Sequence, residues 1–199
     1  MGLIIDSQLT WGEQIITLTS KLNKASYAIS AVKSCMCLEV LRTIYFSYAH
    51  SAISYGIIFW GNSHFSTNIF KVQKRIIRII TNTGRRNSCR LLFKQLQILP
   101  LPSQYIFSLV VFVNTNRELF LSNSEIHDIN TWYNHDLHLP STNLTLVKKG
   151  VLYCGSKIYN CLPLSINALS GDAKRFKTTL KSYLLKHCFY SLDEYYQCQ

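Results

Sequence analysis

The stretch IFKVQKRIIRII, residues 69–80, decides the fold class because it separates apolar and cationic residues onto two faces of one helix. At about 100° per residue, four cations fall within about a third of the helix circumference: Lys71, Lys74, Arg75 and Arg78. The other side is apolar and carries Phe70, Val72, Ile76, Ile77, Ile79 and Ile80. The stretch predicts a helix that starts near Ser66, with one face in a core and one cationic face in solvent.

Apolar residues before this stretch recur every three or four positions, which indicates two further helices with one buried face each. The first covers residues 12–34 and the second covers residues 38–59, with Gly61 available for a C-terminal cap. The short SCMC connection joins them, so we expect them to pack antiparallel. A shorter helix follows Ser88, and the two prolines of residues 99–103 then break the chain.

The pattern after this break is less regular. Ser103 can cap a helix over residues 104–116, although the β-branched valines there leave a strand as an alternative. Residues 119–150 are mostly polar, and GVLYCGSKIYN, residues 150–160, predicts a strand or small hairpin. A basic amphipathic helix runs from residue 173 to about 190. The sequence thus predicts a mainly α protein, with an antiparallel helical bundle followed by a looser α+β region.

The first residues, MGLIIDSQLTW, differ from the helical segments. An apolar β-type run ends at Asp6, and a turn follows at residues 7–8. This pattern is typical of half a β-hairpin, and a lone short strand cannot satisfy its own backbone groups. We therefore expect the run either to pair with a strand far downstream or to have lost a neighbour upstream.

The composition favours a folded protein with a polyanionic partner. The 199 residues are 48% hydrophobic, and 21 basic residues against 10 acidic ones give a net charge of +11. No acidic residue lies between Glu39 and Glu118, a region that holds ten of the lysines and arginines. Such a charge suits nucleic acid or an acidic membrane surface, and this region is the expected binding face.

The cationic helix and the turn after it form the candidate binding site. The turn around Gly84 adds three arginines to the four cations of the helix: Arg85, Arg86 and Arg90. Phosphates need point charges and forked donors but no base-specific shape, so this set suits a nucleic-acid backbone. The alternative is a solvated helix whose lysines keep the protein soluble.

Signals for a membrane span or for secretion are weak. The longest apolar runs, such as residues 106–113, are far shorter than the ~20 residues that a span requires. No basic region and apolar leader precede them. Seven cysteines at irregular spacings do not resemble a disulfide framework, so we expect a reducing intracellular location, cytoplasmic or nuclear.

Signals for catalysis or metal binding are also weak. One polar segment gathers five side chains that can bind a metal or move protons: His127, Asp128, His135, Asp136 and His138. Pro140 and the lack of an apolar period favour a loop there, and Cys35 and Cys37 are too close for the usual zinc knuckle. The sequence has no Gly-rich phosphate loop and no adjacent pair of aspartates for two-metal nucleotidyl transfer. We therefore expect no metal, no cofactor and no catalytic residue.

Two further sets of residues have both a functional and an ordinary interpretation. Five aromatic residues of the second helix can stack on bases, but at helical spacing they are more often core: Tyr45, Tyr48, Tyr55, Phe59 and Trp60. Five cations of the last helix can contact a membrane surface: Lys174, Arg175, Lys177, Lys181 and Lys186. The apolar positions of that helix suffice for ordinary packing.

An ordered series of segments resembles the region that follows the polymerase core in reverse transcriptases of non-LTR (LINE-type, jockey-like) retrotransposons. The series includes GLIIDSQLTW, LRTIYFSYAHSAISYGIIFWGNS, IFKVQKRIIRIITN and, later, SCRLLFKQLQILPLPSQYIFSLVVFV and FKTTLKSYLL. The similarity covers nearly the whole chain in order, although no single segment is as specific as a metal-site motif.

The resemblance implies a domain division and a partner. Residues 1–11 would be the remnant of the palm and its primer grip, with Gly2, Leu3 and Asp6 as the matching positions. Residues 12–100 would be a helical thumb-like domain whose cations lie near the template-primer duplex, and residues 101–199 a C-terminal extension. The implied partners are RNA or an RNA–DNA duplex and a separate polymerase core.

The chain departs from this family in one respect that decides its chemistry. The fingers and palm, with the aspartates that hold the metal ions, are absent from the sequence. We therefore expect a non-catalytic fragment of an RNA-directed DNA polymerase that binds nucleic acid through backbone phosphates. The alternative is a protein-interaction module, or an inert truncated remnant without activity of its own.

Overall fold

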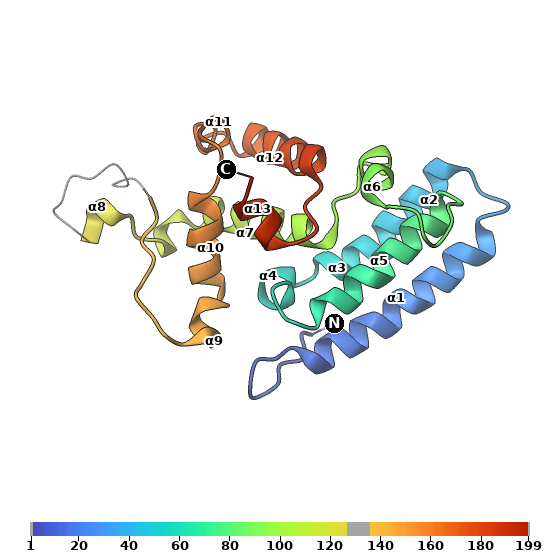
Figure 1. The fold of residues 1–199 in the computed structure, drawn as a ribbon, viewed down its shortest axis with the longest axis horizontal. Helices are drawn as coiled ribbons and strands as arrows, with labels where there is room; N and C mark the ends of the chain where they lie inside the picture. Colours follow the sequence, from blue (N-terminus) through green and yellow to red (C-terminus); the bar gives the residue numbers. More distant parts are fainter. Residues whose placement is uncertain (1, 127–135, 199) are drawn as a thin grey trace.

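The computed structural model describes residues 2–126 and 136–198, and it confirms the prediction of a mainly helical protein (Figure 1). The described residues contain no sheet. Their only β-type pairing is one isolated antiparallel bridge between Ser122 and Leu137. The helices share one contiguous hydrophobic core that extends from the first helix to the last.

Two long helices, α1 (Gly12–Val32) and α5 (Ser66–Ile80), lie side by side along the lower right of the molecule (Figure 1). They run in the same direction, because Asn23 contacts Arg75 in mid-helix and Lys33 contacts Asn82 at their C-terminal ends. The α5 helix starts at Ser66, as the sequence predicts. Its apolar residues are almost fully buried, with Ile69, Ile76 and Ile77 at 0% exposure.

The return from α1 to α5 is helical but broken. It consists of α2 (Leu38–Ile44), the π-helical segment η1 (Tyr45–His50), α3 (Ser51–Ser54) and α4 (Ile57–Trp60). The packing of η1 and α3 on α1 confirms the predicted antiparallel pair. The prediction of one helix over residues 38–59 is wrong beyond Ser54. Tyr55 is extended and Gly56 has a φ of 62°, a left-handed conformation that glycine adopts without strain.

Gly61 has a different role from the predicted left-handed cap. Its φ is −63°, so it stays in the right-handed region at the end of α4. A Cβ atom at Gly61 would collide with the ring of Tyr105 and would lie 2.6 Å from the carbonyl oxygen of Ile57. Gly61 is therefore required for the close approach of α4 to the helix that carries Tyr105.

That helix is α7 (Leu101–Thr115), which follows α6 (Arg90–Leu96). Residues 104–115 are therefore helical, and the alternative of a strand there is wrong. Proline in the first turn of a helix is tolerated because the N–H groups there need no intrahelical partner. The helix accordingly starts at Leu101, before Pro102, and the prediction of Ser103 as its cap is wrong. The Ser103 hydroxyl is buried and donates to the carbonyl of Phe189 at 3.2 Å.

The predicted hairpin over residues 150–160 is wrong, because these residues form the helix α10 (Val151–Asn160). Its buried residues Cys154 and Ile158 are four positions apart, which is helical spacing. Gly155 faces α7, since a Cβ atom there would lie 2.9 Å from a methyl of Val113. The close packing of α10 on α7 outweighs the β preference of its branched and aromatic residues.

The described part of the remaining C-terminal half contains one long helix, α12 (Ala173–His187), and five short helical segments. The short segments are η2 (Arg117–Leu119), α8 (Asn123–Ile126), α9 (Thr145–Lys148), α11 (Leu164–Asn167) and α13 (Leu192–Tyr196). The basic helix α12 begins as predicted but ends at His187, because Cys188 is left-handed with a φ of 52°. The α13 helix was not predicted from the sequence, and the Ser191 side chain caps it by accepting from Glu194 N.

The N-terminal residues form no strand within the described residues, so the predicted pairing with a downstream strand is wrong, while the alternative of a missing upstream partner stays a prediction. The Asp6 carboxylate instead closes a turn by accepting from the backbone N–H groups of Thr10 and Trp11, each at 2.8 Å. The N–H of Ile4 donates to the Gln14 side chain at 3.1 Å. Side-chain acceptors on the turn and on α1 thus satisfy backbone groups for which a partner strand was expected.

The α7 helix contacts both halves of the chain, with α3, α4 and α5 on one side and α10 and α12 on the other. The division into residues 1–11, 12–100 and 101–199 stays a prediction. Within the described residues, no single helix is both long and apolar enough to cross a membrane; α6 and α7 meet these criteria only as a pair bent by 52°.

Candidate nucleic-acid interface

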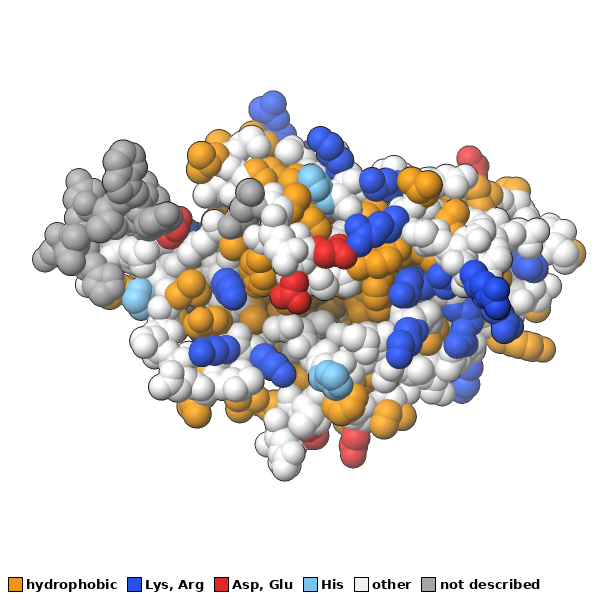
Figure 2. Space-filling view, viewed as in Figure 1, with side chains coloured by type: hydrophobic (Ala, Val, Ile, Leu, Met, Phe, Trp, Pro, Cys, Tyr) orange, Lys and Arg blue, Asp and Glu red, His pale blue; other side chains and the backbone are white. Residues whose placement is uncertain are grey.

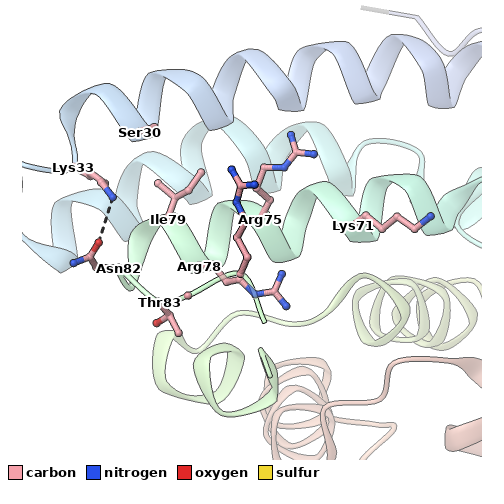
Figure 3. A pocket seen from close by; sticks show the side chains of 10 residues that line it. Ser30, Lys33, Lys71, Arg75, Arg78, Ile79, Asn82 and Thr83 are labelled. Atoms are coloured by element: carbon pink, nitrogen blue, oxygen red, sulfur yellow. Dashed lines mark hydrogen bonds between the residues drawn. The ribbon is translucent and has the colours of Figure 1, made fainter. Parts of the chain in front are cut away.

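A groove of about 790 Å³ lies where the C-terminal ends of α1 and α5 meet the turn after α5 (Figure 3). We call it the arginine groove. Five of its lining residues are cations, and Ile79 is the apolar member: Ser30, Lys33, Lys71, Arg75, Arg78, Ile79, Asn82, Thr83, Gly84 and Arg85. Four of the seven predicted site residues, Lys71, Arg75, Arg78 and Arg85, therefore belong to one concave surface.

Hydrogen bonds within the chain hold two of these cations in place. Arg78 donates from Nε and Nη2 to the carbonyl oxygen of Asn87 at 3.2 and 3.0 Å, which ties the turn to α5. Arg75 donates to the side chain of Asn23 on α1 at 3.2 Å. Each guanidinium has five N–H donors, so both arginines keep donors for a ligand.

The structure separates Lys74 and Arg90 from the arginine groove. Lys74 Nζ lies 4.5 Å from the ring centre of Phe70 and 5.6 Å from that of Tyr190, while Arg90 Cζ lies 4.5 Å from the Tyr190 ring. Arg90 also forms an ion pair with Glu194 at 2.6 Å. Both cations thus flank Tyr190, and the charge of Arg90 is already balanced.

Arg86 is exposed and lies outside the residues that line the arginine groove. Arg85, its neighbour, is exposed and lines the groove. Both arginines follow Gly84 in the turn, but only Arg85 lines the arginine groove. The seven predicted residues are therefore not one site but three groups.

The arginine groove has a strongly positive potential because nothing in the described chain neutralises it. Among the described residues, no carboxylate lies within 4 Å of Lys71, Arg75, Arg78 or Arg85. Like charges held close together raise the local concentration of anions. Guanidinium groups bind phosphate oxygens with forked hydrogen bonds, and an ammonium group adds a mobile point charge. This arrangement can hold phosphate groups.

Two polar residues of the groove were missed by the sequence reasoning. Lys33 lies just after α1 and donates from Nζ to the Asn82 side chain at 3.3 Å (Figure 3). Neither residue belongs to the cationic face of α5. Lys33 stands out in the sequence as a cation at the end of the first predicted helix. Its place in the groove follows only from the parallel packing of α1 and α5, which brings it to Asn82.

The aromatic residues divide between the two interpretations given above. Tyr45 and Trp60 are at 0% exposure and belong to the core. Tyr48, Tyr55 and Phe59 are between 46% and 62% exposed, so their rings are accessible at the surface.

The candidate metal residues lie partly outside the described residues, which exclude His127, Asp128 and His135. Of the remaining two, His138 Nδ1 lies 3.3 Å from the Asn123 side-chain oxygen. No group of three or more metal-binding side chains occurs within residues 2–126 and 136–198. No disulfide forms among the described cysteines, and Cys89, Cys154 and Cys188 are buried.

The three residues that match the primer grip differ in exposure and contacts. Gly2 is exposed, and the side chain of Leu3 packs against Gly56 at the break before α4. Hydrogen bonds from Thr10, first from its N–H and then from its hydroxyl, and from the Trp11 N–H lower the pKa of Asp6. Asp6 therefore orders the entry into α1, and its role in a primer grip stays a prediction.

Comparison of the chain with protein-family models, with curated proteins and with solved structures found no match.

Proposed function

We propose that this chain binds nucleic acid through backbone phosphates, as a non-catalytic fragment of a non-LTR retrotransposon reverse transcriptase. The observation that carries the proposal is the arginine groove, where five cations, Lys33 among them, lie on one concave surface without an ion-pair partner among the described residues. The resemblance of the sequence to the family supplies the polymerase context. The missing pair of adjacent aspartates supports a role without catalysis.

We propose an intracellular location, cytoplasmic or nuclear, for the same protein. The support is that Cys35, Cys37 and Cys198 are exposed thiols that form no disulfide within the described residues. Exposed thiols persist in a reducing compartment and tend to oxidise outside it.

The experiment is a binding titration of an RNA–DNA hybrid across a salt series. The arginine-groove variant carries Lys71→Gln, Arg75→Gln and Arg85→Gln, and it keeps Arg78 because that residue holds the turn. A matched control carries Lys24→Gln, Lys148→Gln and Lys149→Gln, three exposed cations outside the groove. The control has the same net charge, so it separates the groove from the overall charge.

The slope of log affinity against log salt is negative, and on a duplex each lost phosphate contact reduces its magnitude by about 0.9. We therefore expect the slope of the arginine-groove variant to be smaller in magnitude by about 2–3 than that of the wild type. The control variant is expected to stay much closer to the wild type. Equal slopes for the two variants would show that the groove has no special role, and absence of wild-type binding would refute the function.

A second candidate function is a protein-interaction module, and one observation favours it. A separate and more apolar groove of about 400 Å³ lies between the residues before α1, the end of α4 and the start of α10. Leu9, Phe59 and Phe65 line it and are each more than 40% exposed. A folded chain that ignores nucleic acid but binds a separate polymerase core would favour this function.

A further inference from the structure

A second cationic groove of about 780 Å³ lies between α6, α7 and α12. We call it the lysine groove. Four lysines line it without any carboxylate in the lining: Lys94, Lys177, Lys181 and Lys186. Three of them come from α12, the basic helix whose cations were considered above for contact with a membrane surface.

Lysine and arginine side chains lead from one groove toward the other. Lys74 lies one helical turn before Arg78 of the arginine groove, and its Nζ lies 5.6 Å from the Tyr190 ring. Arg90 covers the same ring, with Cζ 4.5 Å from its centre. Lys94 of the lysine groove lies one turn after Arg90 on α6.

Lys94 of α6 and Lys186 of α12 line the same groove and both act on the His187 side chain. The pKa of His187 is lowered mainly by burial and further by the positive charges of Lys186 and Lys94. These two lysines come from α12 and α6, so both helices direct a cation toward the same region. Figure 2 shows lysine and arginine side chains following one another from the right side of the molecule, over α5 and α6, to α12 at the top.

One carboxylate interrupts this series, and it is already neutralised. Glu194 Oε1 lies 2.6 Å from Arg90 Nη2, and its Oε2 accepts from the N–H of Tyr190 at 2.9 Å. With its charge paired and both oxygens occupied, Glu194 adds little repulsion toward a phosphate chain. The half-buried Tyr190 ring meets the buried Phe70 ring edge to face at 5.0 Å, and Lys74 and Arg90 flank Tyr190.

We propose that the two grooves are the ends of one path for a continuous nucleic-acid backbone, which runs from the arginine groove across Lys74, Tyr190 and Arg90 to the lysine groove. This inference rests on the proposed function and adds the length of nucleic acid that the chain holds. The lysine groove recognises phosphates as point charges, so it extends the site without adding sequence preference.

The path predicts that affinity depends on ligand length. The α5 helix is about 22 Å long at about 1.5 Å per residue, so a hybrid of about 7 base pairs, at about 3.4 Å per pair, matches one groove. A hybrid of about 24 base pairs is about three times as long and reaches both grooves. We expect the wild type to show a steeper salt dependence with the longer hybrid, since more phosphates are contacted.

The test uses hairpin-closed RNA–DNA hybrids of these two lengths with three variants. The lysine-groove variant carries Lys177→Gln, Lys181→Gln and Lys186→Gln, all exposed positions, beside the arginine-groove variant and the matched control. Circular dichroism and thermal melting verify that each variant is folded. We expect the lysine-groove variant to reduce the magnitude of the salt slope for the long hybrid by about 2–3, to near the value for the short one.

Three results would overturn the single path. An unchanged slope of the lysine-groove variant on the long hybrid would end the site at the arginine groove, while the proposed function would stand. Binding of two long hybrids per chain would show two separate sites. If the lysine-groove variant binds both hybrids like the wild type but no longer binds vesicles of acidic phospholipid, α12 would be assigned to a membrane surface. Absence of wild-type binding to either hybrid would instead refute the proposed function itself.

Discussion

Replacement of Gln73 by leucine tests the packing that positions the arginine groove. Gln73 lies on the buried face of α5 at 1% exposure. Its amide nitrogen donates to the Tyr45 hydroxyl at 2.9 Å and to the Leu99 carbonyl at 3.0 Å, and its oxygen accepts from Leu101 N at 2.9 Å. One side chain thus joins α5 to η1 and to the start of α7.

The expected cost follows from the three groups that Gln73→Leu leaves unsatisfied. A buried polar group without a partner costs about 1–3 kcal/mol, and the added apolar burial of leucine offsets part of the sum. We expect a net loss of about 3 kcal/mol in the free energy of unfolding. In a chain of this length 1 kcal/mol corresponds to about 2–4 °C, so the Tm should fall by about 6–12 °C.

The assay is thermal and urea unfolding followed by circular dichroism, with two companion variants. Tyr45→Phe removes one of the three partners and should cost about 1 kcal/mol. Gln95→Leu changes an exposed glutamine of α6 and should stay within about 0.5 kcal/mol of the wild type. If Gln73→Leu is no less stable than Tyr45→Phe, the three hydrogen bonds do not hold α5 and α7 together as argued.

Three further changes have a defined direction. Gly61→Ala should destabilise the fold by about 1–3 kcal/mol, measured by the urea midpoint, because the new methyl collides with the Tyr105 ring. Asp172→Ala removes the side chain that accepts from two N–H groups at the start of α12, so the free energy of unfolding should fall by about 1 kcal/mol. Burial, and secondarily the charge of Lys181, lower the pKa of His50 from 6.5. The unfolded chain therefore takes up this proton first, stability falls as the pH drops below 6.5, and His50→Asn should flatten that decline in urea unfolding.

Local periodicity was enough for much of the fold. The helices that contain residues 12–32, 66–80 and 173–187 follow from apolar residues at helical spacing, which each segment shows without reference to the rest of the chain. The break after Ser54 was not predicted because the aromatic ladder continues through Tyr55, while Gly56 adopts a left-handed conformation and Trp60 is buried. The α10 helix was missed because its β-type composition is overruled by packing on α7.

The sequence by itself determined that α5 has one apolar and one cationic face, since both follow from residue type and a period of 3.6. Only the tertiary structure decided which cations share a surface. Arg75 turns toward α1 and Lys74 toward Tyr190, although they are adjacent in the sequence. The arginine groove needs the parallel packing of α1 on α5, and its continuation needs α12 beside α6. These contacts join residues far apart in the chain, and no local pattern encodes them.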